Sequence, residues 1–289
     1  MILVTGATGQ VGRGVIAHLA GTADVRALVR DRAAAADLGD VEVAVGSFED
    51  AGSLERATAG VRTLFLAGRD NPDQVAQHAR VLAAAAAAGV QHVVKLSAIG
   101  ASADSPVALM RAHHATEEQL RASDLRWTFL RPHLYMQNLL RFAGDVAASG
   151  RLAAPMDDRR VPLVDVRDVG AAAAGVLRAP EDHTGRTYAL TGPQALRYAE
   201  VADRIGDLIG RPIVYEAVAP ERFRAGLLAA GVPAWRADDL AAIAAAYTDA
   251  ENVPSPDLES LLDRPATPIE RFLADHRDVF LAGAARSHL

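Results

Sequence analysis

The sequence predicts an α/β fold built on a doubly wound parallel sheet, with a smaller lobe toward the C-terminus. Short apolar segments alternate with helical patterns through the first half of the chain. The strand segments are continuously apolar, which is typical of parallel strands covered by helices on both faces. Right-handed crossovers between such strands produce a doubly wound sheet. After Pro132 the alternation gives way to short strands among helices, which indicates the lobe.

Each element has a local signal. The apolar run that opens the chain predicts the first strand, and glycine or proline ends most of the later elements. Further strands are expected at 24–29, 41–45, 61–66, 91–97, 125–130, 161–164 and 187–190, and helices at 72–88, 106–122 and 135–149. The last 70 residues are expected to be mainly helical.

Composition excludes several classes of protein. A chain of 289 residues with 50% apolar and 23% charged residues can bury a large core. The net charge of −6 and the lack of a basic run argue against nucleic-acid binding, and no apolar stretch is long enough for a bilayer. Without cysteine there are no disulfides or thiolate sites, and the histidines are too scattered for a metal site. Because Met1 leads directly into a strand, we expect no signal peptide and a cytoplasmic monomer or homodimer.

Three glycines spaced three apart connect the first strand to the first helix. Gly6 allows a turn with positive φ, Gly9 allows a pyrophosphate to approach the backbone, and Gly12 allows close packing of helix on strand. The helix N-terminus then points its amides at the phosphates. An ordinary glycine-rich turn is the alternative. The position between strand and helix favours a dinucleotide site, in a core over residues 1–150, followed by a mainly substrate-binding lobe over 151–289 with some elements returning to the core.

Arg30 stands at the end of the second strand, where the cofactor's adenosine ribose is recognised. A guanidinium suits a 2′-phosphate and therefore favours NADP(H) over NAD(H). Asp31 could instead bind a ribose hydroxyl or cap the next helix, and Arg30 could be a solvated surface residue.

Several motifs together resemble one known family. The turn Thr5-Gly6-Ala7-Thr8-Gly9-Gln10-Val11-Gly12 with Arg30, the run 113–117, the run 128–132, the run 136–138 and the run 164–169 occur in the family's order. The chain is similar to the NmrA-like group of atypical short-chain dehydrogenase/reductases, and within it to the branch of NADPH quinone reductases and triphenylmethane or azo-dye reductases. The resemblance covers positions 1 to about 192 and implies a Rossmann fold, NADP(H), and a substrate cleft between core and lobe.

The resemblance and the strand ends together give the expected ligand contacts. The expected cofactor-binding residues are Gly6, Thr8, Gly9, Gln10, Val11, Gly12, Arg30, Ser47, Phe48, Ala67 and Gly68. The family usually has Gly-Asp after its third strand, whereas this chain has Gly46-Ser47, so Ser47 replaces the aspartate in part. The expected substrate-binding residues are Tyr135, Met136 and Asn138, although the first two could equally pack the domain junction.

The Tyr-x-x-x-Lys motif of ordinary short-chain dehydrogenases is absent from the sequence. Lys95 is the only lysine, the residue four positions before it is Gln91, and we interpret Lys95 as a structural or solvated strand residue. His113 takes the place of the active-site tyrosine as expected proton donor or substrate anchor, with Glu117 one turn later to orient it. A surface helix pair is the alternative. Ser97, at the end of its strand, is a second catalytic candidate or a simple turn serine.

Two functions fit this sequence. The first is an NADPH-dependent reductase that transfers a hydride to a conjugated aromatic or quinone-type small molecule without a Tyr-Lys pair. The second is a dinucleotide-binding redox sensor without chemistry, as in the regulatory NmrA members. The intact glycine turn and the apolar segment at 135–136 favour the enzyme.

Overall fold

The computed structural model describes residues 1–283, and its architecture confirms the predicted α/β fold. Seven strands, all parallel, form one sheet in the order β3-β2-β1-β4-β5-β6-β9. They are β1 (Ile2–Val4), β2 (Val25–Val29), β3 (Glu42–Val45), β4 (Thr63–Leu66), β5 (His92–Leu96), β6 (Arg126–Pro132) and β9 (Arg186–Leu190). The strand order reverses between β1 and β4, which in open sheets is the usual place for a ligand.

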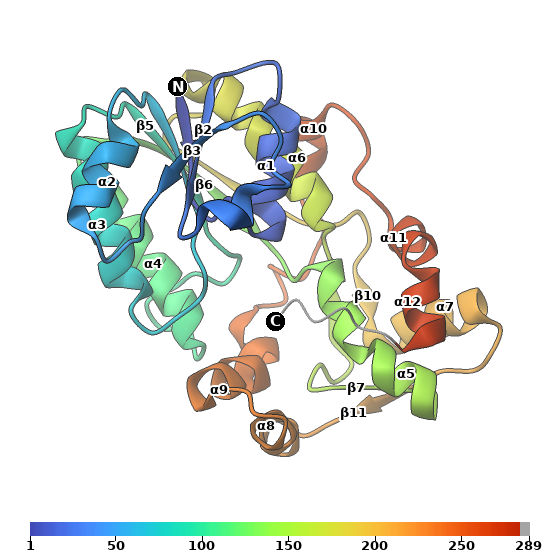
Figure 1. Ribbon diagram of the computed structural model, residues 1–289. Helices are drawn as coiled ribbons and strands as arrows, with labels where there is room; N and C mark the ends of the chain where they lie inside the picture. The colour runs from blue at the N-terminus through green and yellow to red at the C-terminus, as the bar shows by residue number, and fades with distance from the viewer. Residues whose placement is uncertain (284–289) are drawn as a thin grey trace.

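Helices cover both faces of this sheet (Figure 1). One face carries α1 (Gln10–Leu19) and α6 (Val166–Arg178), and the other carries α2 (Ala51–Thr58), α3 (Gln74–Ala87) and α4 (Ala108–Arg121). A Cβ added to Gly170 of α6 would lie 3.0 Å from Gly14 Cα of α1, so glycines allow these two helices to pack backbone against backbone. Across residues 1–283, no helix combines the length and apolar character needed to cross a membrane.

A second hydrophobic cluster forms the lobe, around Leu139, Val146, Val201, Ile205 and Phe272. Its elements are η2 (Met136–Phe142), α5 (Ala143–Ser149), β7 (Arg151–Ala154), β8 (Arg160–Val161), β10 (Leu196–Arg197), α7 (Tyr198–Ile209), β11 (Val214–Ala217), α8 (Pro220–Ala229), α9 (Ala234–Ala242), η4 (Ile243–Ala246), α11 (Ile269–Asp275) and α12 (Arg277–Ala282). The helix predicted over 135–149 is thus a 3₁₀ segment followed by a short α-helix, and the strand predicted over 161–164 extends only over β8.

The chain passes between core and lobe more than once. After the lobe begins, α6 and β9 return to the sheet, and α10 (Asp257–Leu262) then packs against both of them. Short 3₁₀ turns, η1 (Arg32–Ala35) and η3 (Pro180–His183), complete the core. The predicted division at residue 150, with some later elements returning to the core, stays a prediction. Residues 284–289 of the predicted lobe lie outside the described residues.

One carboxylate joins the two units at α4. The side chain of Asp239, in α9, accepts hydrogen bonds from the Ala108 amide (2.7 Å) and the Leu109 amide (3.1 Å) at the first turn of α4. Two otherwise unpaired amides of the helix N-terminus are therefore satisfied by a residue 131 positions away. Because α4 carries His113, the lobe helps to hold the helix of the predicted active site.

Candidate active site

The glycine turn lies at the carboxyl edge of the sheet, as predicted. Gly6 has φ +60° and its carbonyl accepts a hydrogen bond from the Gly9 amide at 2.9 Å. Thr8, Gly9 and Gln10 are exposed, and among residues 1–283 no side chain caps α1, which begins at Gln10. The helix N-terminus is therefore open to an anionic ligand.

Gly12 allows this turn to close against α1. A Cβ at Gly12 would collide with the Gly6 carbonyl oxygen and would lie 2.8 Å from the Gly6 carbonyl carbon and 2.9 Å from Ala7 Cα. These neighbours are backbone atoms, so they have no side-chain rotamer by which to move away. Gly12 and the adjoining Val11 are buried beneath the turn.

The end of β4 lies beside the same turn. The Thr5 hydroxyl donates to the Ala67 carbonyl (2.7 Å) and accepts from the Ala67 amide (2.9 Å), which fixes the end of β4 to the end of β1. At Gly68, a Cβ would lie 3.0 Å from His78 Nε2 and 3.2 Å from the Phe48 ring. Ala67 thus packs under the glycine turn, and Gly68 lies against the Phe48 ring; all three residues are predicted to contact the cofactor.

The next two strand ends carry Arg30 and Ser47. Arg30 is exposed, and within residues 1–283 no hydrogen bond or ion pair joins its guanidinium to another residue. Asp31, in contrast, caps the following 3₁₀ turn by accepting the Ala33 amide at 3.0 Å, which supports the capping interpretation of that residue. Ser47 is half-buried and its hydroxyl accepts the Glu49 amide in a local turn.

Of the two roles that the sequence leaves open for Lys95, structural or solvated, the structure excludes the solvated one. Its exposed fraction is 0%, and its ammonium nitrogen lies 2.9 Å from the Leu96 carbonyl oxygen and 2.9 Å from His113 Nδ1. His113 is 9% exposed. The only lysine of the chain and the predicted catalytic histidine thus form a buried pair at the carboxyl end of β5.

Glu117 does not pair with His113 as predicted. Its side chain is fully buried and accepts hydrogen bonds from Arg131 at Nε (2.9 Å) and Nη2 (2.5 Å), and from the Ser97 hydroxyl (2.6 Å). Arg131, at the end of β6, offers a planar fork that matches both carboxylate oxygens. The Ser97 hydrogen is committed to Glu117, so this hydroxyl can offer a ligand only an acceptor.

Burial controls the protonation of this cluster. It lowers the pKa of Lys95 to about 7, while the charge of Glu117 opposes the shift and that of Arg131 adds to it. Burial, followed by the charge of Lys95, also holds the pKa of His113 well below 6.5. For Glu117 burial raises the pKa, but hydrogen bonds from Arg131 and Ser97 outweigh it, and the net shift is downward. Near neutral pH the carboxylate is charged and the imidazole neutral.

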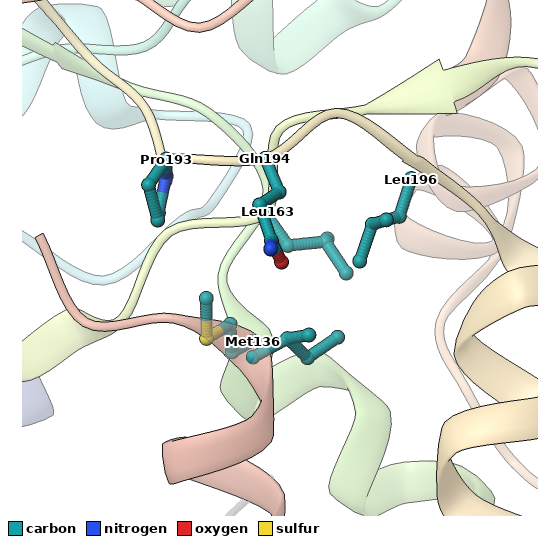
Figure 2. Close-up of a pocket in the computed structure, with 6 residues that line it drawn as sticks. Met136, Leu163, Pro193, Gln194 and Leu196 are labelled. Carbon is teal, nitrogen blue, oxygen red and sulfur yellow. The ribbon is translucent and has the colours of Figure 1, made fainter.

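The segment after β6 carries the three predicted substrate residues, and the structure separates them. Tyr135 and Asn138 are half-buried, whereas Met136 is 1% exposed. Figure 2 shows the Met136 side chain among Leu163, Pro193, Gln194 and Leu196, inside the lobe. The Met136 thioether belongs to the hydrophobic core of the lobe, which favours the packing role that the sequence leaves open beside a substrate wall.

Comparison with known proteins identifies the family. The NmrA-like family matches residues 1–275, which is nearly the whole described chain. The chain belongs to the NmrA-like family.

Among NmrA-like relatives, a reductase of (4-alkanoyl-5-oxo-2,5-dihydrofuran-3-yl)methyl phosphate from Streptomyces griseus is 37% identical, over 97% of this chain and 99% of its own. An NAD(P)H azoreductase from Xenophilus azovorans is also 37% identical, over 82% and 84% of the two chains. The structure of an NADPH-dependent quinone oxidoreductase from Escherichia coli, complexed with NADPH, superposes with TM-score 0.86 at 30% identity and covers 95% of this chain and 99% of its own. The predicted family and its reductase branch are therefore confirmed.

Several buried polar residues of this NmrA-like chain have no clear signal in the sequence. His78, on α3, is 2% exposed, and neither ring nitrogen finds a hydrogen-bond partner within residues 1–283. Arg131 was visible only as part of a motif, and Asp239 reaches α4 from a distant helix. Lys95 carried a signal that could have been used: a lysine inside a continuously apolar strand of a parallel sheet must be buried and paired.

Proposed function

We propose that this chain reduces a flat, conjugated small molecule, such as a quinone, with NADPH. The relatives above support the oxidoreductase class and the cofactor, and both agree with the predictions from the sequence. The observation that carries the proposal is the position of the Lys95–His113 pair, at the same carboxyl edge as the glycine turn. The proposed dinucleotide site and the Lys95–His113 pair would therefore lie along one edge of the sheet.

The residues present fit an NADP(H) molecule. The open N-terminus of α1 offers amides to the pyrophosphate, and Gly9 presents a backbone without a Cβ beside them. Arg30 offers an exposed guanidinium to the 2′-phosphate. When bound, the nicotinamide supplies a hydride. The protein's part is to orient both ligands, exclude water and deliver a proton.

Arg30 should decide the preference for NADPH over NADH. We expect Arg30→Ala to lose about 1.5–3 kcal/mol of NADPH affinity, equivalent to about 10- to 150-fold in Kd, and to leave NADH affinity nearly unchanged. Titrating both proteins with both cofactors measures this difference. Arg32→Ala, two residues further on, is the matched control. Equal affinities for both cofactors in wild type and variant would reject the assignment.

His113 should contribute the proton or anchor the acceptor. We expect His113→Phe to lower turnover about 10- to 100-fold, because the substitution fills the volume but removes the hydrogen bond, while water partly substitutes. NADPH affinity should change little, because this ring belongs to the Lys95 pair and not to the glycine turn. His114→Phe is the control. If both variants keep wild-type turnover, or only His114→Phe is impaired, the choice of histidine is wrong.

Acceptor specificity separates the reductase from a dinucleotide sensor. NADPH oxidation would be followed with a naphthoquinone, an azo dye and an acyl-dihydrofuranone phosphate, three classes taken from the relatives' activities. Oxidation with at least one class is the expected result. A protein that binds NADPH and oxidises it with none of them would be a sensor.

A further inference from the structure

The buried Lys95–His113 pair limits how His113 can donate a proton in the proposed reductase reaction. His113 is almost fully buried, and burial together with nearby positive charge opposes an imidazolium. A neutral ring that gives up its only N–H hydrogen would become an imidazolate, which is a very poor product. His113 can act as a proton donor only if its other nitrogen receives a proton in the same step.

The geometry places a donor at that other nitrogen. An ammonium has three hydrogens and no lone pair, so Lys95 in its charged form must donate to each of its two neighbours. One hydrogen goes to the Leu96 carbonyl and one to His113 Nδ1, both at 2.9 Å. Nδ1 is then an acceptor, and the ring hydrogen must be on Nε2. Within residues 1–283, no hydrogen bond to Nε2 is found.

We propose that Lys95 supplies the proton consumed by the reduction and passes it through the His113 ring. As the acceptor carbon gains the hydride, its conjugated oxygen or nitrogen takes the hydrogen from Nε2, and Nδ1 takes one from Lys95. The acceptor is reduced by two electrons, the cofactor is oxidised, His113 stays neutral, and Lys95 becomes a neutral amine. Because Lys95 itself is fully buried, its proton returns from water along the same ring.

The electrostatic surroundings suit a lysine that changes charge near neutral pH. Burial lowers the pKa of Lys95 to about 7, and charged groups on three different segments modulate this shift. Glu117 on α4 and Asp70 after β4 favour the ammonium, whereas Arg131 on β6 disfavours it. His78 on α3 is close enough to be affected by the charge of Lys95. Burial, followed by this charge, lowers the pKa of His78 to about 3. His78 is therefore neutral and does not compete for the proton.

The single lysine makes a direct test possible. Protein labelled with ¹³C at lysine Cε gives one lysine side-chain signal, and ¹⁵N-labelled histidine reports the tautomer of His113. We expect the Lys95 signal to titrate near pH 7, and the His113 hydrogen to be on Nε2 below that midpoint. In Lys95→Met the tautomer of His113 should no longer depend on pH. In Lys95→Arg the His113 ring should stay in the Nε2–H form at all pH values, because arginine stays charged.

Kinetics provide the second readout. Wild-type turnover of NADPH with 2-methyl-1,4-naphthoquinone should fall as pH rises through the Lys95 midpoint. Lys95→Met and Lys95→Arg should both be about 10- to 100-fold slower, with profiles that are flat from pH 6 to 9 and an unchanged KM for NADPH. His114→Phe should keep the wild-type profile.

The outcomes distinguish this inference from the proposed function on which it rests. A lysine midpoint near 10, or a His113 tautomer that Lys95→Met leaves unchanged, overturns the relay whether or not the protein turns over. A wild-type pH profile in Lys95→Met overturns it while the reductase function stands. If none of the acceptors supports NADPH oxidation by wild type, the proposed function fails. Proton transfer to a substrate then fails as well, even if the NMR signals show that Lys95 and His113 share a hydrogen bond.

Discussion

The Gly12→Ala variant should lose at least about 100-fold in affinity for NADPH, or about 2.7 kcal/mol. The added Cβ would collide with the Gly6 carbonyl oxygen and crowd Ala7 Cα at 2.9 Å. Because both neighbours are backbone, the glycine turn must move or α1 must shift away from β1. Either change displaces the amides that would face the pyrophosphate, and such overpacking also costs about 1–3 kcal/mol of stability.

Fluorescence titration with NADPH measures the affinity, and urea unfolding measures the stability. Gly14→Ala is the matched control, since its Cβ would lie on the same helix at an ordinary 3.4 Å from the nearest atom, Gly170 Cα. We expect that variant to bind NADPH like wild type. Wild-type affinity in a folded Gly12→Ala protein would mean that the turn does not form the cofactor site.

The Glu117→Ala variant should be less stable than wild type by about 3–5 kcal/mol, because it leaves Arg131 without its buried partner. The carboxylate is fully buried and accepts from Arg131, from the Ser97 hydroxyl and, at 3.2 Å, from Arg121. The adjacent Glu118 provides the control. It is exposed, and within residues 1–283 it pairs only with Arg121, so Glu118→Ala should cost less than about 1 kcal/mol.

The Glu117 contribution should also depend on pH. Its pKa lies below the usual 4.5 in the folded protein, because hydrogen bonds from Arg131 and Ser97 outweigh burial. The stabilisation is therefore complete above about pH 4.5 and decreases as the pH falls through the folded-state value. Urea unfolding of wild type and Glu117→Gln should converge on acidification. A constant difference between them down to pH 3 would contradict this account.

Local patterns predicted the sheet and the nucleotide edge well. The strands of the main sheet end within two residues of their expected bounds, because apolar runs and the glycines that end them are local features of the sequence. Gly6, Gly9 and Gly12 lie where their spacing places them for the same reason. Asp31, with two roles open in the sequence, caps its turn through a bond to Ala33, only two positions away.

Contacts between distant segments were harder to predict. Helical spacing correctly puts His113 and Glu117 on one face of α4, and that face is buried. Their contacts with Lys95 of β5 and Arg131 of β6 cannot be predicted from spacing along α4. For Lys95 the sequence leaves a structural and a solvated role open, because residue type alone does not reveal how deeply a strand inside the sheet is buried. For Met136 the sequence leaves packing and substrate contact open, because its burial depends on lobe residues that are distant in the chain, such as Leu163 and Leu196.

The bond from Asp239 to α4 has a consequence for how such proteins can change their substrates. The lobe supplies the carboxylate that completes the first turn of the helix carrying His113. A lobe exchanged between relatives would therefore have to bring an equivalent carboxylate, or leave two amides of α4 without acceptors. Recombination at the core–lobe boundary is constrained by this one side chain, whereas substitutions that leave Asp239 in place can reshape the lobe without disturbing the helix.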